Sequence, residues 1–161
     1  MKHTRSLAID PGYDRLGVAV FEGKELIYSE CFVPPKGELV ERLLAVSNKV
    51  EEIVKKYKPT SLAIETLFFN KNQKTAIAVA EARGVIMVAA MRHGLAIHEY
   101  SPQSVKIAVT GSGNANKDGV IRMVHRLIKL DPSTPLGARR LDDEYDAIAL
   151  GIAHTTRNPH L

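Results

Sequence analysis

The sequence predicts an α/β sandwich in which helices flank a mixed five-stranded sheet, with three antiparallel strands followed by two parallel ones. Two observations indicate this class. Three short apolar runs separated by turns open the chain, and apolar runs then alternate with stretches of helical periodicity. With 161 residues, of which 45% are hydrophobic, the chain suits one compact domain over residues 1–161.

The first three strands are expected to pair in an antiparallel meander. Residues 5–10 (RSLAID) and 17–21 (GVAVF) are apolar runs on either side of a Pro-Gly turn. Residues 26–33 (LIYSECFV) form the third run after another short turn. Such short connections favour antiparallel pairing of consecutive strands.

A crossover helix is expected after the meander. In residues 38–57 the apolar side chains recur every three or four positions, which indicates an amphipathic helix ending before Pro59. Residues 61–65 (SLAIE) then form a buried strand, 74–94 a second helix and 95–100 a fifth strand. A right-handed crossover places the fourth strand parallel to the first and beside it.

Three helices are expected to complete the chain. Ser101 and Pro102 occupy the N-cap and N1 positions of a helix over 102–109. A second helix covers 117–130, and the third lies in 139–154 (RRLDDEYDAIALGIAH), where acidic residues open an otherwise aliphatic stretch.

Carboxylates are expected to gather at one edge of the sheet. Asp10 ends the first strand and Glu65 ends the fourth, so they lie side by side where open α/β sheets usually bind ligands. Asp143 and Asp146 share one face of the last helix and can point into the same space. Asp142 is on that face too, so spacing alone does not choose between it and Asp143.

Grouped carboxylates need cations. They repel one another and their pKa values rise unless positive charge neutralises them. Oxygen ligands without His or Cys suit Mg²⁺ or Mn²⁺ rather than Zn²⁺. Each acid alone is more typical of a turn or a helix cap, but Glu65 interrupts the apolar run SLAIETLFF and Asp146 precedes a mostly aliphatic stretch. The combination favours a metal site, and two ions about 3.5 to 4 Å apart can hydrolyse a phosphodiester.

The charge balance suits a polyanionic partner. The net charge is +4, and with four acids assigned to a metal site the 22 basic residues face only 14 other acids. No apolar run approaches the roughly 20 residues that span a bilayer, and the start of the chain lacks the apolar centre of a signal peptide. We therefore expect a cytoplasmic protein with no membrane partner that binds nucleic acid.

These features resemble the RuvC family of bacterial Holliday junction resolvases, which have a ribonuclease H-like fold. The similarity runs in order along nearly the whole chain, in the four motifs LAIDPGYDRLGVAV, AIETLFFNKNQKTAIAVAEARGVI, SPQSVKIAVTGSGNANK and DDEYDAIALGIAH. The resemblance implies an endodeoxyribonuclease that resolves four-way junctions in DNA recombination and repair. It would do so by symmetric, metal-dependent hydrolysis of phosphodiesters in two strands.

The resemblance also implies a metal-ligand set. It matches Asp10, Glu65, Asp143 and Asp146 to the family's acidic ligands, with two Mg²⁺ ions per active site and Mn²⁺ as a substitute. It thereby selects Asp143 over Asp142.

Five residues are expected to contact DNA. The resemblance implies that Lys106 and Lys117 face phosphate and that Phe68 projects toward the crossover. Lys71 and Lys74 flank this loop, an arrangement typical of a base-stacking aromatic beside phosphate contacts. The alternative that the phenylalanines of the loop anchor the core stays open.

The resemblance further implies a homodimer, because two symmetric cuts need two sites related by a twofold axis, and the RuvA–RuvB branch-migration complex as a partner. Leu16 and Asp14 depart from the family pattern in the first hairpin. Two other functions stay open: a ribonuclease H-fold nuclease for other branched or RNA-containing substrates, and a non-catalytic branched-DNA-binding module. A module that only binds would not need four mutually repelling carboxylates.

Overall fold

The computed structural model describes residues 4–67, 73–128 and 142–158. The strands are β1 (Arg5–Asp10), β2 (Leu16–Glu22), β3 (Glu25–Phe32), β4 (Ser61–Glu65) and β5 (Ala96–Tyr100). They form one sheet in the order β3-β2-β1-β4-β5. The pairs β1–β2 and β2–β3 are antiparallel, and β1–β4 and β4–β5 are parallel. The predicted mixed sheet is confirmed.

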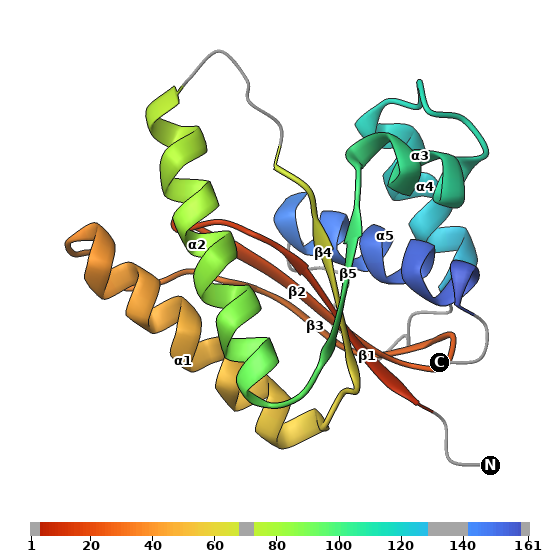
Figure 1. The fold of residues 1–161 in the computed structure, drawn as a ribbon. Helices are drawn as coiled ribbons and strands as arrows, with labels where there is room; N and C mark the ends of the chain where they lie inside the picture. The colour runs from red at the N-terminus through yellow and green to blue at the C-terminus, as the bar shows by residue number, and fades with distance from the viewer. Residues whose placement is uncertain (1–3, 68–72, 129–141, 159–161) are drawn as a thin grey trace.

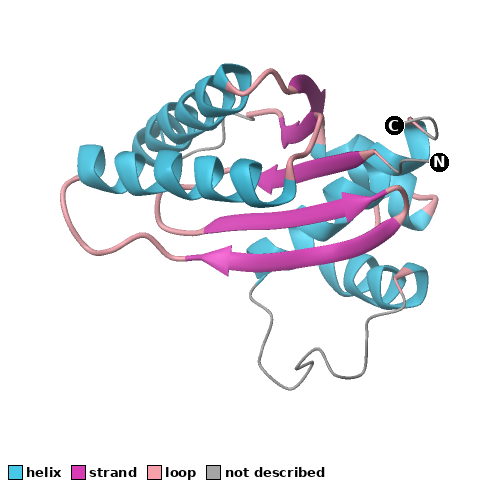
Figure 2. Cartoon of the chain, turned by 90° about the horizontal axis from the view of Figure 1, so that it is seen from below, coloured by secondary structure: helices cyan, strands magenta, loops and turns pink. Residues whose placement is uncertain are grey.

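Helices cover both faces of this sheet (Figures 1 and 2). They are α1 (Leu39–Tyr57), α2 (Gln73–Arg92), α3 (Pro102–Thr110), α4 (Lys117–Leu127) and α5 (Asp142–Arg157). Helices α1 and α2 pack on one face, and α3, α4 and α5 on the other. In the part of the chain that the structure describes, none of these helices has the length and apolar character needed to cross a membrane.

Side chains that alternate along the strands form two cores, one on each face of the sheet, and place Asp10 and Glu65 on the same face. Leu7 and Ile9 pack in the core beneath α1 and α2, whereas Ala8 belongs to the core beneath α5. Because successive strand residues point to opposite faces, Asp10 lies on the α5 face. The same alternation in β4 places Glu65 on that face.

Helix α5 lies close to the sheet at two points where glycines have no side chain. A Cβ on Gly151 would be 2.1 Å from Cε2 of Phe21, and a Cβ on Gly17 would be 1.9 Å from the backbone oxygen of Asp143. Contacts this short are sterically excluded. Gly17 therefore allows the first turn of α5 to approach β1 and β2, and Gly151 allows the middle of α5 to pack on Phe21 of β2.

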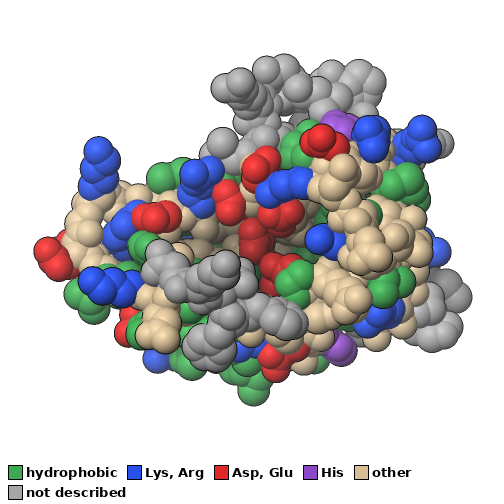
Figure 3. Space-filling view, turned by 90° about the horizontal axis from the view of Figure 1, so that it is seen from above, with side chains coloured by type: hydrophobic (Ala, Val, Ile, Leu, Met, Phe, Trp, Pro, Cys, Tyr) green, Lys and Arg blue, Asp and Glu red, His purple; other side chains and the backbone are tan. Residues whose placement is uncertain are grey.

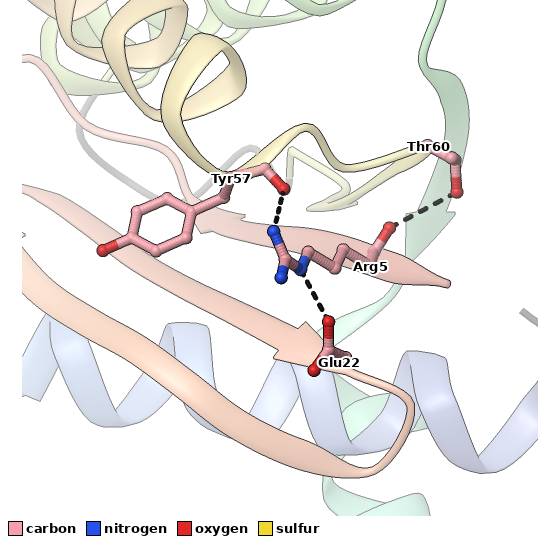
Figure 4. A network of polar contacts seen from close by, with 4 residues as sticks. All are labelled: Arg5, Glu22, Tyr57 and Thr60. Carbon is pink, nitrogen blue, oxygen red and sulfur yellow. Dashed lines mark hydrogen bonds and ion pairs between the residues drawn. The ribbon is translucent and has the colours of Figure 1, made fainter. Parts of the chain in front are cut away.

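A network of hydrogen bonds connects the elements at the amino end of β1, away from Asp10 (Figure 4). Arg5 Nε donates to Oε1 of Glu22 at 2.8 Å, and Arg5 Nη1 donates to the backbone oxygen of Tyr57 at 3.0 Å. The backbone oxygen of Arg5 accepts a hydrogen bond from the Thr60 amide at 2.9 Å. One arginine thus joins the start of β1 to the end of β2, the end of α1 and the approach to β4.

His154 is fully buried under the sheet as a structural residue. Its Nε2 lies 3.0 Å from Oγ of Ser61, and its Nδ1 lies 2.8 Å from the hydroxyl of Tyr100. Burial and the neighbouring ring of His98 lower the pKa of His154 to about 4. These bonds join α5 to β4 and β5.

Candidate active site

Two strands bring two carboxylates to the same level of the sheet. Ile9 pairs with Ile64 in the parallel ladder between β1 and β4, and Asp10 and Glu65 are the next residues. Both side chains lie on the α5 face, at the carboxyl ends of their strands. The structure thus places Asp10 and Glu65 side by side, as the sequence predicts.

The first turns of α5 supply the other acids. The side chains of Asp143 and Asp146 are 30% and 39% exposed, whereas that of Asp142 is 66% exposed. Asp143 also lies 3.6 Å, through Oδ2, from Nη1 of Arg15. Of the two neighbouring aspartates, Asp143 therefore lies deeper and nearer the turn that follows Asp10.

Lys117 lies between the carboxylates of α5. Its Nζ is 3.3 Å from Oδ2 of Asp142 and 3.3 Å from Oδ2 of Asp146. Lys117 is the first residue of α4, whose N-cap Asn116 accepts a hydrogen bond from the Gly119 amide at 2.8 Å. Burial lowers the pKa of Lys117, but the two aspartates outweigh burial and raise it overall. The lysine stays charged.

Two hollows meet at Lys117. One, of about 370 Å³, is lined by Asp10, Asp143 and the turn over residues 11–15. The other, of about 320 Å³, is lined by Glu65, Asp146, Lys106 and other residues of α3, α4 and α5, and Lys117 borders both. Seen from above, acidic side chains gather in the centre of this end of the molecule with basic side chains around them (Figure 3).

Negative charge accumulates around Asp10. Burial, and then the charges of Glu65, Asp146 and Asp143, raise its pKa to about 8, with only partial compensation by Lys117. A carboxyl group with an ordinary pKa of 3.8 is therefore largely protonated at neutral pH in the metal-free protein.

Glu65 is perturbed in the same direction. Burial and the charge of Asp146 raise its pKa to about 7, although Lys106 and Lys117 act to lower it. Burial also raises the pKa of Asp146 itself. The lysines near these acids are thus too few to neutralise them.

The donor set suits a hard divalent cation. All four side chains offer carboxylate oxygens, the ligands that Mg²⁺ and Mn²⁺ prefer. Within the described ranges, no three acidic, His or Cys side chains already converge on one point as a metal-binding group. The acids instead face two adjoining hollows on either side of Lys117. The residues therefore fit a divalent ion by the chemistry of their oxygens and by their charge.

The predicted DNA-contact residues divide into three groups. Lys106 and Lys117 border the cleft. Lys74 is exposed in the first turn of α2, next to Thr75, which lines the first hollow. Phe68 and Lys71 lie outside the described residues, so their roles stay predictions.

Sequence reasoning missed two contributors to this site. Arg15 pairs with Asp143, and Gly17 lets the backbone of α5 approach Asp10, its partner in the β1–β2 ladder. An isolated glycine beside an apolar strand is a known signal for close backbone approach and could have identified Gly17. The pairing of Arg15 depends on tertiary contact and leaves no local pattern.

Comparison with known proteins agrees with this geometry. A family model described as crossover junction endodeoxyribonuclease RuvC matches residues 6–154. The RuvC protein of Brachyspira hyodysenteriae is 42% identical over 161 residues, covering 95% of this chain and 94% of that protein. The RuvC protein of Moorella thermoacetica is 40% identical over 159 residues, covering 95% and 92%.

A solved structure extends the agreement to three dimensions. The structure of T. thermophilus RuvC in complex with a Holliday junction substrate matches with a TM-score of 0.85 at 29% identity, covering 98% of this chain and 96% of that one. Sequence and structure therefore agree over almost the full length of both proteins. The chain belongs to the RuvC family of crossover junction endodeoxyribonucleases.

Proposed function

We propose that this protein resolves Holliday junctions by divalent-metal-dependent hydrolysis of phosphodiesters in two strands, with Asp10, Glu65, Asp143 and Asp146 as its catalytic acids. One observation carries the assignment. Carboxylates from β1, β4 and α5 line adjoining hollows at the carboxyl edge of the sheet, and their pKa values are raised where they are most buried.

We assign the four acids as ligands of two Mg²⁺ ions, which Mn²⁺ can replace. Nucleases of the RuvC family depend on divalent metal ions. When bound, a pair of such ions activates a water molecule and stabilises the charge that develops on the phosphate and the leaving oxygen. Asp10 and Glu65 hold their positions from rigid strand ends, whereas Asp143 and Asp146 reach the cleft from the first turns of α5.

Basic side chains bring the phosphate to these acids. Lys106 and Lys117 border the hollow that contains Glu65, and their ammonium groups offset the repulsion between carboxylates and an approaching phosphate. Lys74 supports the DNA backbone outside the cleft. Phe68 is assigned to stack on an unpaired base at the crossover, with Lys71 contacting phosphate beside it.

A second copy of the chain is the proposed occupant of an apolar groove between α1 and α2. The groove encloses about 580 Å³, and its walls include Val40, Leu44 and Val88, whose side chains are 71%, 62% and 54% exposed. Met91, one turn farther along α2, is 59% exposed. Two symmetric cuts require two active sites related by a twofold axis, so an apolar face shared by two copies suits the reaction.

The dimer has a direct test. Val88→Glu places a charge in the centre of the proposed interface and should shift the sedimenting species from dimer to monomer. An unchanged dimer in this variant would locate the interface elsewhere.

The RuvA–RuvB complex is the proposed partner that delivers the junction.

Cleavage of a synthetic four-way junction tests the function. The substrate is incubated with the protein beside a linear duplex and an RNA–DNA hybrid, in Mg²⁺ or in EDTA. We expect paired cuts in the junction in Mg²⁺ only. Preferential cutting of the hybrid would support a different ribonuclease H-fold nuclease, and junction binding without cutting in any metal would support a binding module.

A further inference from the structure

One arginine connects helix α2 to the strand that carries Glu65. Arg83 Nε donates a hydrogen bond of 3.0 Å to the backbone oxygen of Glu65. Its Nη2 forms an ion pair with Oε2 of Glu99 on β5, and the Arg83 side chain is only 18% exposed. The guanidinium thus contacts the ends of two neighbouring strands at once.

This contact lies where the main chain of β4 leaves the sheet. Glu65 is the last residue of β4 and pairs with Tyr100 of β5. After this pair there is one more backbone hydrogen bond, which the Thr66 amide donates to the oxygen of Tyr100 at 2.9 Å. Beyond this point the regular ladder ends, so a side chain from outside the sheet holds the carbonyl of Glu65.

Arg83 and the carboxylate of Glu65 lie on different faces of the sheet. Helix α2 packs on the face opposite to α5, whereas the Glu65 side chain points into the α5 hollow with Lys106 and Lys117. These two lysines oppose the rise in the pKa of Glu65 that burial and Asp146 cause. Arg83 therefore acts on the backbone of Glu65, and the lysines act on its charge.

We propose that Arg83 is a positioning residue for Glu65: by fixing its carbonyl from the far face of the sheet, Arg83 sets where the Glu65 carboxylate lies relative to Asp10. This inference rests on the proposed role of Glu65 as a metal ligand. A planar guanidinium can hold the Glu65 carbonyl and the Glu99 carboxylate together in one fixed geometry, which a lysine ammonium does not reproduce. Groups that orient metal ligands in this way typically contribute about 10- to 100-fold to metal affinity or activity.

The test compares Arg83→Met with wild type in Mn²⁺ binding and in junction cleavage, with junction affinity in EDTA as the control. Mn²⁺ binding to the protein without DNA is followed by electron paramagnetic resonance of the free ion. Junction cleavage is measured in single turnover across a Mn²⁺ titration. We expect the half-saturating Mn²⁺ concentration to rise by about 10- to 100-fold in both. Junction affinity in EDTA should change by less than about twofold, because Arg83 lies on the face away from the cleft.

Three further variants separate positioning from general stability. Glu99→Gln removes the charge partner of Arg83 but keeps the bond from Arg83 to Glu65, so its Mn²⁺ affinity should stay near that of wild type. Lys55→Met removes an exposed ion pair with Glu51 on α1, away from the active site, and should change neither measurement. Arg83→Lys keeps the cation but loses the two-pronged contact, and should fall between wild type and Arg83→Met.

The outcomes are distinguishable. If Arg83→Met binds Mn²⁺ and cuts like wild type while Glu65→Gln does not cut, the positioning role is overturned and the proposed function stands. If Glu65→Gln itself cuts normally, the proposed function fails. Equal losses of Mn²⁺ affinity in Arg83→Met and Glu99→Gln would also overturn the inference, because they would assign the effect to the ion pair. If Arg83→Met does not fold, Arg83→Lys and Glu99→Gln decide by the same comparison.

Discussion

The two ends of the central strands β1 and β4 have opposite electrostatic character. At the amino end of β1, Arg5 meets the Glu22 carboxylate and the Tyr57 carbonyl, so charge and hydrogen-bonding capacity are matched. At the carboxyl ends, Asp10 and Glu65 are buried beside other acids, and their pKa values rise to about 8 and about 7. The same pair of strands is stabilised at one end and electrostatically strained at the other.

This difference suits the amino end to a structural role and the carboxyl end to binding positive charge. Burying like charges destabilises a fold unless something positive accompanies them. The amino end is electrostatically balanced by its own side chains, whereas the proposed function requires divalent cations to balance the carboxyl end. Substitutions at the two ends should therefore have opposite consequences for stability and for activity.

The largest expected effect is loss of cutting at the carboxyl end. Asp10→Asn, Glu65→Gln, Asp143→Asn and Asp146→Asn should each lower the junction cleavage rate by more than about 100-fold, since even an outer-shell partner of a metal contributes up to that factor. Each amide keeps the shape of the acid, so junction binding should remain. Gel shift and cleavage on the same preparation measure both. If Asp142→Asn stops cutting and Asp143→Asn does not, the assignment on α5 moves by one residue.

A smaller effect is expected from changing how α5 meets the sheet. In Gly17→Ala the new Cβ would stand 1.9 Å from the backbone oxygen of Asp143, so the start of α5 must move. Such overpacking typically costs about 1 to 3 kcal/mol of unfolding free energy. Cleavage should fall more than junction binding does, because Asp143 moves with the helix. Unchanged cleavage with a lowered melting temperature would show that the position of Asp143 is not critical.

Asp10→Asn should also stabilise the metal-free protein, in a pH-dependent way. The folded-state pKa of Asp10 is raised from 3.8 to about 8, so its ionisation lowers the stability of wild type as the pH rises between these values, and the asparagine variant lacks this contribution. Denaturant unfolding in EDTA at pH 8 should favour the variant by at least about 1 kcal/mol, which corresponds to less than one pKa unit. The advantage should shrink toward pH 4. A variant less stable than wild type at pH 8 would show that the acids are not strained.

The smallest effect belongs to the amino end. Arg5→Met removes an ion pair with Glu22 and a hydrogen bond to Tyr57, and the Arg5 side chain is 38% exposed. The loss of unfolding free energy should be about 1 kcal/mol, the usual size for partly exposed contacts of this kind. The cleavage rate at a temperature where the variant is folded should match wild type. A large drop in that rate would mean that the two ends are coupled.

The sequence was sufficient to predict the sheet and the meeting of Asp10 with Glu65. Strand order follows from the alternation of apolar runs, and adjacency follows from the handedness of one crossover. The spacing of the acids left Asp142 and Asp143 equivalent, and only the resemblance to the family favoured Asp143. Their different exposure appears only once α5 is placed on the sheet.

Contacts made by long side chains were beyond prediction from the sequence. Arg83 lies in an apolar helix and Arg15 in a turn, and neither position carries a periodic signal. Each arginine contacts a residue that only the packing of the helices and strands brings near. Gly17 could be predicted in part. A glycine in an apolar strand indicates that another backbone lies close, but the sequence does not show which segment this is.

Thermal unfolding with and without Mg²⁺ tests most directly whether divalent cations complete the carboxyl end. A ligand that binds only the folded state stabilises it by mass action, by about 2.7 kcal/mol at 100 times its dissociation constant. Mg²⁺ should therefore raise the melting temperature of wild type and of Arg5→Met equally, and should raise that of Asp10→Asn far less. An equal Mg²⁺-induced rise in Asp10→Asn, or none in wild type, would contradict the account.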